Sequence, residues 1–332
     1  MSSVLRALGP DLDDDLAGRL SEGLAAVEER ISEEVKSSDS FVSETAGHLL
    51  EAGGKRFRPL VTLLAAQFGD PNAPGVVPAA VVVELTHLAT LYHDDVQDEA
   101  ELRRGADSAN NRWGNAIAIL TGDFLFARAS DILADLGTEA VRLQARTFER
   151  LVHGQIHETL GPGAGEDPID HHLRVLADKT GSLIGASSRY GGMLAGTSAA
   201  ELELLTQWGE RIGVAFQLSD DLIDIASETG ESGKTPGTDL REHVSTLPVL
   251  LLRRAARPGD ADLLRALDGD LSTDAELTQV LAALRAHPVM AEAHGVLAGY
   301  AEDARRTVRL LPDGPPRAAL EALCDYMVNR SA

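Results

Sequence analysis

Cysteine is almost absent from this chain, since Cys324 is the single one among 332 residues. An internal disulfide is therefore excluded, as is usual for proteins of the reducing cytosol. Residues 1–15 lack the apolar segment of a signal peptide, and the apolar stretches near residues 76–85 and 247–252 are far too short to cross a bilayer. We therefore expect a cytoplasmic protein with no membrane span.

Basic residues are also scarce, with 30 Lys and Arg against 52 Asp and Glu, a formal net charge of -22. Such a field repels nucleic acid and anionic membrane surfaces, so neither is expected as a partner. It would equally repel a phosphorylated substrate. A site for such a substrate needs Lys, Arg or metal ions of its own.

No alternation typical of strands, no internal repeat and no low-complexity linker stands out, whereas apolar residues recur at helical spacing. We expect helices over residues 16–35, 77–102, 116–136, 139–160, 294–311 and 316–328. Capping boxes at Ser198-x-x-Glu201 and Thr273-x-x-Glu276 open two more. The length allows two domains, but we expect one all-α domain over residues 1–332, a helical bundle around a deep central cavity.

Two aspartate boxes of the form D-D-x-x-D lie in these helical stretches, DDVQD at residues 94–98 and DDLID at residues 220–224. Positions i and i+4 share a helix face, so the first and last aspartates of each box aim at one point. Gathered carboxylates repel one another unless cations lie between them, and oxygen ligands of this kind suit Mg²⁺. The boxes predict a Mg²⁺ site that holds a diphosphate. The alternatives are a solvated helix end for the first box and a buried ion-pair network for the second.

Basic residues near these boxes could supply phosphate contacts. Arg103 and Arg104 follow the first box within about two helical turns. The segment GGKRFRP at residues 53–59 gathers three more basic residues, and His87 lies two helical turns before the first box. Exposed basic loops and a structural histidine are the competing interpretations.

The order of these motifs is specific. GGKRFRP, DDVQD-x5-RRG, DKTG at residues 178–181, FQLSDDLID and GK-x-x-GTDLRE-x-x-x-TLP resemble the trans-isoprenyl (polyprenyl) diphosphate synthase family, by motif over roughly residues 45–255. The resemblance implies an isoprenoid-synthase fold and a homodimer. It also implies Mg²⁺-dependent transfer of an allylic diphosphate's prenyl group to isopentenyl diphosphate, with a three-ion cluster around the bound diphosphate.

The resemblance also implies roles for single residues. It makes Asp94, Asp98 and Asp220 the principal Mg²⁺ ligands, supported by Asp95, Asp221 and Asp224. It assigns the isopentenyl diphosphate pocket to Lys55, Arg58, His87 and Arg104. It assigns the allylic side to Arg103, Lys179, Thr180, Gln217 and Lys234. The catalytic set is Asp94, Asp98, Arg103, Lys179, Gln217 and Asp220. One departure is that His243 and Val244 stand where many members have Gly-Lys, so neither receives a phosphate role.

Product length in this family depends on the residues four and five positions before the first box, here Thr90 and Ala89. Both are small, which resembles synthases of medium- to long-chain products of roughly six to ten isoprene units, such as quinone side chains. The alternative for Ala89 is ordinary core packing. A short-chain geranylgeranyl or farnesyl diphosphate synthase is the nearest rival. A non-catalytic subunit of a heteromeric synthase and a terpene cyclase fit two intact boxes less well.

Overall fold

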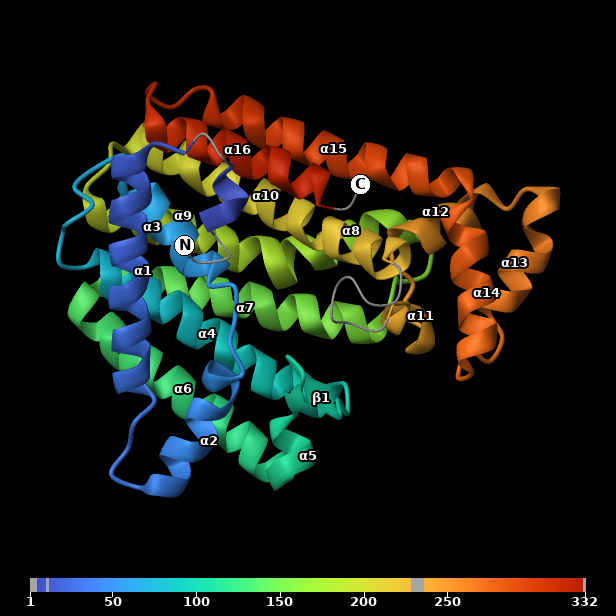
Figure 1. The fold of residues 1–332 in the computed structure, drawn as a ribbon, viewed down its shortest axis with the longest axis horizontal. Helices are drawn as coiled ribbons and strands as arrows, with labels where there is room; N and C mark the ends of the chain where they lie inside the picture. Colours follow the sequence, from blue (N-terminus) through green and yellow to red (C-terminus); the bar gives the residue numbers. More distant parts are fainter. Residues whose placement is uncertain (1–4, 10–11, 228–235, 331–332) are drawn as a thin grey trace. The chain divides into compact units, whose positions relative to one another are not determined.

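The computed structural model describes residues 5–9, 12–227 and 236–330, and most of them are helical. The first part runs η1 (Leu5–Leu8), α1 (Asp14–Glu34), α2 (Ser40–Glu51), α3 (Phe57–Ala66), α4 (Val76–Gln97), β1 (Leu102–Arg103), β2 (Ala106–Asp107), α5 (Ala109–Trp113), α6 (Asn115–Leu136) and α7 (Thr138–Leu160). Next come α8 (Pro168–Leu176), η2 (Ala177–Gly181), α9 (Ser182–Ala195) and α10 (Ala199–Ala226). The chain ends with α11 (Thr238–Arg241), α12 (Leu247–Ala255), η3 (Pro258–Asp260), α13 (Ala261–Leu267), α14 (Asp274–Arg285), α15 (Pro288–Val308) and α16 (Pro315–Asn329) (Figure 1). The all-α prediction is confirmed.

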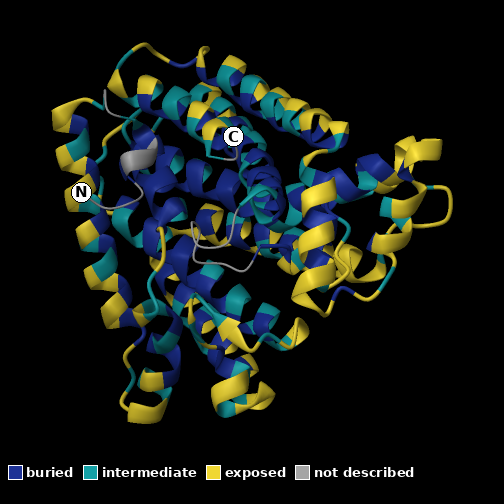
Figure 2. Ribbon diagram, turned by 45° about the vertical axis from the view of Figure 1, so that its right-hand side comes forward, coloured by how far each residue is buried: buried dark blue, intermediate teal, exposed yellow. Residues whose placement is uncertain are grey.

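Local sequence explains where these helices begin. Asp13 caps α1 by accepting a hydrogen bond from the Leu16 backbone N–H at 2.9 Å, which satisfies one of the free amides of the first turn. The predicted capping box at Ser198 is present, with the Ser198 N–H donating to Glu201 at 3.0 Å and the Glu201 N–H donating to Ser198 at 3.3 Å. Thr273 caps α14. Figure 2 shows the resulting pattern on individual helices, with a buried stripe on one side and an exposed stripe on the other.

The chain forms two compact units, each described by itself. Unit 1 comprises residues 1–148, 183–209 and 307–322, and unit 2 comprises residues 149–182, 210–306 and 323–332. In unit 1, α4 packs against α1, α3 and α6. In unit 2, α8 packs against α12, and α13 against α14. Unit 1 contains the first aspartate box, and unit 2 contains the second.

Helix α4 forms the centre of unit 1. Its residues from Ala79 to Thr86 are all buried. By length and composition it is the one helix in the described part of the chain that could cross a membrane, but 67% of its most apolar window is buried inside the protein. Such burial is typical of a core helix, whose apolar faces pack against neighbouring helices.

The predicted helix over residues 77–102 is too long. Helix α4 ends at Gln97, Asp98 is its C-cap, and Glu99 follows with φ 48°. Strands β1 and β2 then pair antiparallel across a turn at Arg104 (φ 55°) and Gly105 (φ 80°). Left-handed residues of this kind end a helix and favour a tight hairpin, so Arg103 and Arg104 extend from a hairpin and not from the helix. The prediction of no strands was wrong at this place.

Candidate active site

The first aspartate box lies at the end of α4. Asp95 is fully buried, Asp94 is half-buried and Asp98 is exposed. Arg103 donates from Nε to Asp95 Oδ1 at 2.5 Å. Burial raises the pKa of Asp95, although the Arg103 charge opposes that rise. The other oxygen, Asp95 Oδ2, is buried and accepts no hydrogen bond within the described part of the chain.

The segment GGKRFRP leads into α3 beside this box, still within unit 1. Its first arginine, Arg56, adopts the left-handed conformation (φ 51°) and is buried. Arg56 donates to Glu84 of α4 at 3.0 Å and to Glu28 of α1, so it ties together three helices. Burial alone would lower the pKa of Arg56, but the hydrogen bonds and charges of Glu28 and Glu84 raise it. Arg56 therefore has a structural role, whereas Lys55 is exposed and Arg58 half-buried.

Arg104 joins this segment to the hairpin. Its guanidinium donates to the Leu49 carbonyl at the end of α2, at 2.8 Å, and to the Gly53 carbonyl. A cation at the carboxyl end of a helix is favourable because it meets unpaired carbonyl groups. A Cβ at Gly54 would lie 3.1 Å from Arg104 Nη1 and 2.4 Å from Arg56 Nη1. Glycine thus lets the two arginines approach this loop.

His87 is held neutral by its surroundings. Its pKa is lowered well below the ordinary value of 6.5, first by burial and then by the positive charges of Arg58, Arg104 and Arg103. The charges of Arg58 and Arg104 therefore act on His87 in this structure.

In unit 2, the DKTG segment forms the π-helical turn η2 between α8 and α9. Turns of this kind break the regular helical ladder and are frequent at functional sites. Two glycines let neighbouring helices approach this turn. A Cβ at Gly154 would lie 2.8 Å from the backbone nitrogen of Lys179, and a Cβ at Gly181 would lie 3.1 Å from the backbone carbonyl oxygen of Glu210. Lys179 donates to Glu158 at 2.5 Å.

A chain of polar contacts runs from η2 to the second aspartate box. The Thr180 hydroxyl donates to Gln217 Oε1 at 3.2 Å, and Gln217 Nε2 donates to Asp221 Oδ1 at 3.1 Å. His172 of α8 lies on the other side of this carboxylate, with Nε2 3.3 Å from Asp221 Oδ2. Thr180 and Asp221 are buried. The structure therefore joins three predicted residues and adds His172, which the sequence pattern did not indicate because it lies 49 positions from its partner.

The remaining aspartates of the second box have separate partners. Asp220 forms an ion pair with Arg330 near the end of the chain. Asp224 accepts hydrogen bonds from the backbone N–H groups of Thr238 and Asp239, both at 3.2 Å. Lys234, predicted on the allylic side, lies outside the described residues. Among residues 5–9, 12–227 and 236–330, no three His, Cys, Asp or Glu side chains are gathered as metal ligands.

The chemistry of the donors nevertheless fits a divalent cation. Carboxylate oxygens are the preferred ligands of Mg²⁺ and Ca²⁺. The buried Asp95 Oδ2 lacks the hydrogen bond that a buried polar atom ordinarily makes. A cation at this oxygen would satisfy it.

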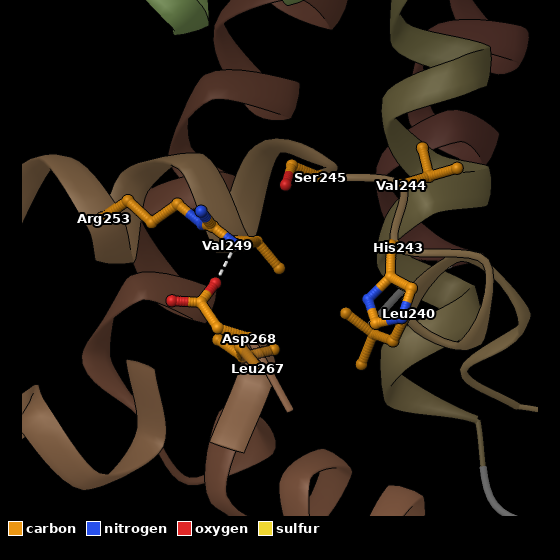
Figure 3. Close-up of a pocket in the computed structure, with 8 residues that line it drawn as sticks. All are labelled: Leu240, His243, Val244, Ser245, Val249, Arg253, Leu267 and Asp268. Atoms are coloured by element: carbon orange, nitrogen blue, oxygen red, sulfur yellow. Dashed lines mark hydrogen bonds and ion pairs between the residues drawn. The ribbon is translucent and has the colours of Figure 1, made fainter. Parts of the chain in front are cut away.

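A separate cavity of about 220 Å³ lies in unit 2 (Figure 3). Its walls carry an ion pair of 2.8 Å between Arg253 and Asp268, with His243 across from it (Figure 3). The lining residues are Leu240, His243, Val244, Ser245, Val249, Arg253, Leu267 and Asp268. None of the residues predicted to bind metal or substrate lines it. His243 and Val244, which depart from the family pattern, are both exposed here.

The chain is similar to several known proteins. The polyprenyl synthetase family model matches residues 39–284. The nonaprenyl diphosphate synthase of Mycobacterium tuberculosis is 52% identical over 324 residues, 97% of each chain. A geranylgeranyl pyrophosphate synthase structure from Corynebacterium glutamicum, complexed with calcium and isoprenyl diphosphate, is similar with a TM-score of 0.86 and 44% identity, over 96% of this chain and 98% of that one. A polyprenyl synthase from Caulobacter crescentus with the same ligands has a TM-score of 0.87 and 33% identity, over 98% and 100%.

Proposed function

This chain belongs to the polyprenyl synthetase family, and we infer that it is a prenyltransferase that condenses isopentenyl diphosphate with an allylic diphosphate. The product is a medium- to long-chain all-trans polyprenyl diphosphate. The observation that carries this conclusion is the 52% identity to a nonaprenyl diphosphate synthase over 97% of both chains. Both aspartate boxes are complete, which separates the chain from a non-catalytic subunit.

We propose Mg²⁺ as the cofactor. Asp94, Asp98 and Asp220 would be its principal ligands, and the neighbouring aspartates of each box would support them. When bound, the metal ions would neutralise the diphosphate as the allylic C–O bond breaks. The unsatisfied Asp95 Oδ2 and the calcium in two related structures support a divalent cation.

The basic cluster of unit 1 would bind isopentenyl diphosphate. Lys55, Arg58 and Arg104 supply positive charge, which an acidic protein needs wherever it binds a diphosphate. Neutral His87 has one ring N–H to donate to a phosphate oxygen. The double bond of this substrate then attacks the allylic carbon, and the proton lost from the adduct passes to the departed diphosphate.

The residues of the allylic side would bind the other diphosphate and stabilise the carbocation. Arg103, Lys179 and Lys234 supply positive charge, whereas Thr180 and Gln217 present oxygen dipoles to the cation. The contact of 3.2 Å between Thr180 and Gln217 supports this role because it fixes the direction of both groups. The reaction needs no protein nucleophile.

The chain would act as a cytoplasmic homodimer, as the family resemblance implies. In unit 2, helix α7 supports a second copy as partner, because Val152 and Ile156 are exposed although they are apolar, and their spacing places them on one face. Sedimentation of the purified chain tests this. A monomer at micromolar concentration would contradict it.

The alternative is a short-chain synthase, because the related structure with 44% identity is a geranylgeranyl pyrophosphate synthase. Incubation of the purified chain with Mg²⁺, labelled isopentenyl diphosphate and several allylic primers decides between the two by product mass. The substitution Asp94→Ala should lower kcat by several orders of magnitude. Near-normal turnover in this variant would remove the metal role of Asp94, and an inactive wild-type chain would overturn the proposed function.

A further inference from the structure

The side chain of Arg330 is buried against the second aspartate box, with 8% of it exposed. Its Nη2 group forms the ion pair with Asp220 Oδ1, and its Nε group donates to the Ser219 hydroxyl at 2.8 Å. The guanidinium also lies over two aromatic rings, 4.4 Å from the centre of Phe216 and 5.9 Å from that of Tyr326. A planar cation fixed by a carboxylate, a hydroxyl and two rings is placed far more firmly than a surface ion pair.

This contact lies where a cation is needed. Asp220, Asp221 and Asp224 concentrate three carboxyl groups within one and a half helical turns, and like charges at this spacing repel. Asp221 meets Gln217 and His172, and Asp224 accepts from backbone amides, whereas Asp220 meets the guanidinium of Arg330. Its side chain is 34% exposed, so solvent and ligands can reach the remaining oxygen.

We propose that Arg330 is a positioning residue of this box, a resident counter-cation that holds Asp220 and gives up its oxygen when a divalent cation binds. The inference rests on the proposed function, because it takes Asp220 as a metal ligand. A cation at this carboxylate and the Arg330 guanidinium repel each other, so metal binding works against the ion pair. The apparent affinity for metal is reduced accordingly, since the metal must bind against the charge of the paired guanidinium. By the same linkage, metal binding weakens the contact between Arg330, which directly follows α16, and Asp220 of α10.

The experiment measures Mn²⁺ binding to the full-length protein by calorimetry, with inorganic diphosphate present. Arg330→Gln should bind Mn²⁺ about tenfold more tightly than wild type, a typical scale for two linked binding events. Its metal-free melting temperature should fall, and Mn²⁺ should raise that temperature more than in wild type. Arg330→Lys keeps the charge but not the planar fork, so its affinity should lie between the two.

Arg305→Gln is the matched control. Arg305 also belongs to the C-terminal helices of unit 2, and it pairs with Glu302 at 2.7 Å and with Asp325, neither of which belongs to the second aspartate box. Its loss should lower the melting temperature and leave Mn²⁺ affinity unchanged. If Arg330→Gln does not fold, Ser219→Ala removes the 2.8 Å contact and should shift affinity in the same direction by less.

Unchanged or weaker Mn²⁺ binding in folded Arg330→Gln overturns the inference and leaves the proposed function intact. If the wild-type chain binds no Mn²⁺ with diphosphate, both fail.

Discussion

Substitution of Arg56 by methionine tests whether the basic GGKRFRP segment divides into a structural and a binding part. Arg56 and Glu84 are 8% and 3% exposed, and their side chains meet at 3.0 Å. Methionine keeps the bulk of the side chain but leaves the Glu84 carboxylate in the core without its cation. Breaking a buried pair in this way typically costs about 3–5 kcal/mol of stability.

Protonation sets an upper limit to that loss. A stranded carboxylate can escape by binding a proton, and at pH 7 this costs about 3.7 kcal/mol for an ordinary glutamate, from about 2.7 pH units at 1.36 kcal/mol each. The folded variant then binds a proton that the unfolded chain lacks, so its deficit grows as pH rises. We expect Arg56→Met to lose about 3–4 kcal/mol at pH 7 and about 1.4 kcal/mol less for each unit by which pH is lowered toward 5.

Urea unfolding at pH 7 and pH 5.5 provides the measurement. Arg112→Met is the matched control, because Arg112 and Glu44 form an ion pair of 2.7 Å that is about half exposed on both sides. Its loss should cost less than about 1 kcal/mol, with no pH dependence of this kind. The double variant Arg56→Met with Glu84→Met should recover most of the stability. Equal costs for the two arginines, or a pH-independent deficit, would refute the assignment of Arg56 to the core.

Two further substitutions test packing in unit 1. Ala89→Phe places a large ring at a fully buried position of α4, so mass analysis should show a shorter prenyl product; a product of wild-type length would mean that Ala89 does not limit product length. Gly191→Ala would bring a Cβ within 2.0 Å of the Thr62 carbonyl oxygen, so thermal unfolding should show a loss of at least about 1–3 kcal/mol from overpacking. Gly299→Ala is its control, because that Cβ meets nothing within 4 Å and should be neutral or slightly stabilising.

Local chemistry was largely readable from the sequence. Capping residues and apolar spacing located α1, α6, α7, α10 and α14 to within a few residues, because a helix start depends on contacts across three or four positions. The end of α4 was misplaced because the left-handed residues Glu99 and Arg104 are not glycines. Nothing in their identity announces a positive φ.

The ion-pair partners of the charged residues could not be predicted from the sequence. Arg330 and Asp220 are 110 positions apart, and Arg56 and Glu84 are 28 apart. Helical spacing relates residues of one helix to one another, so it finds carboxylates that share a face but not the cation that reaches them from another helix. The sequence therefore identified the acidic boxes, whereas the counter-charges around them became visible only through tertiary packing.

The neutral state of His87 gives a measure of the positive potential in the proposed isopentenyl diphosphate pocket. Burial and the charges of Arg58 and Arg104 lower its pKa well below 6.5. A bound diphosphate would offset that positive charge, and a nearby negative charge favours the protonated ring. We therefore expect isopentenyl diphosphate to raise the pKa of His87.

Histidine NMR of labelled protein measures this pKa directly. Without ligand, the His87 signal should not titrate between pH 7 and pH 6; with isopentenyl diphosphate its midpoint should move upward. In Lys55→Ala the same shift should need a higher ligand concentration, because the exposed lysine contributes attraction without shaping the core. His243, exposed in the separate cavity, is the internal control, and adding isopentenyl diphosphate should leave its NMR signal in place. If the His87 midpoint stays unchanged at saturating ligand, the bound diphosphate lies away from this histidine. The basic cluster would then have only a structural role.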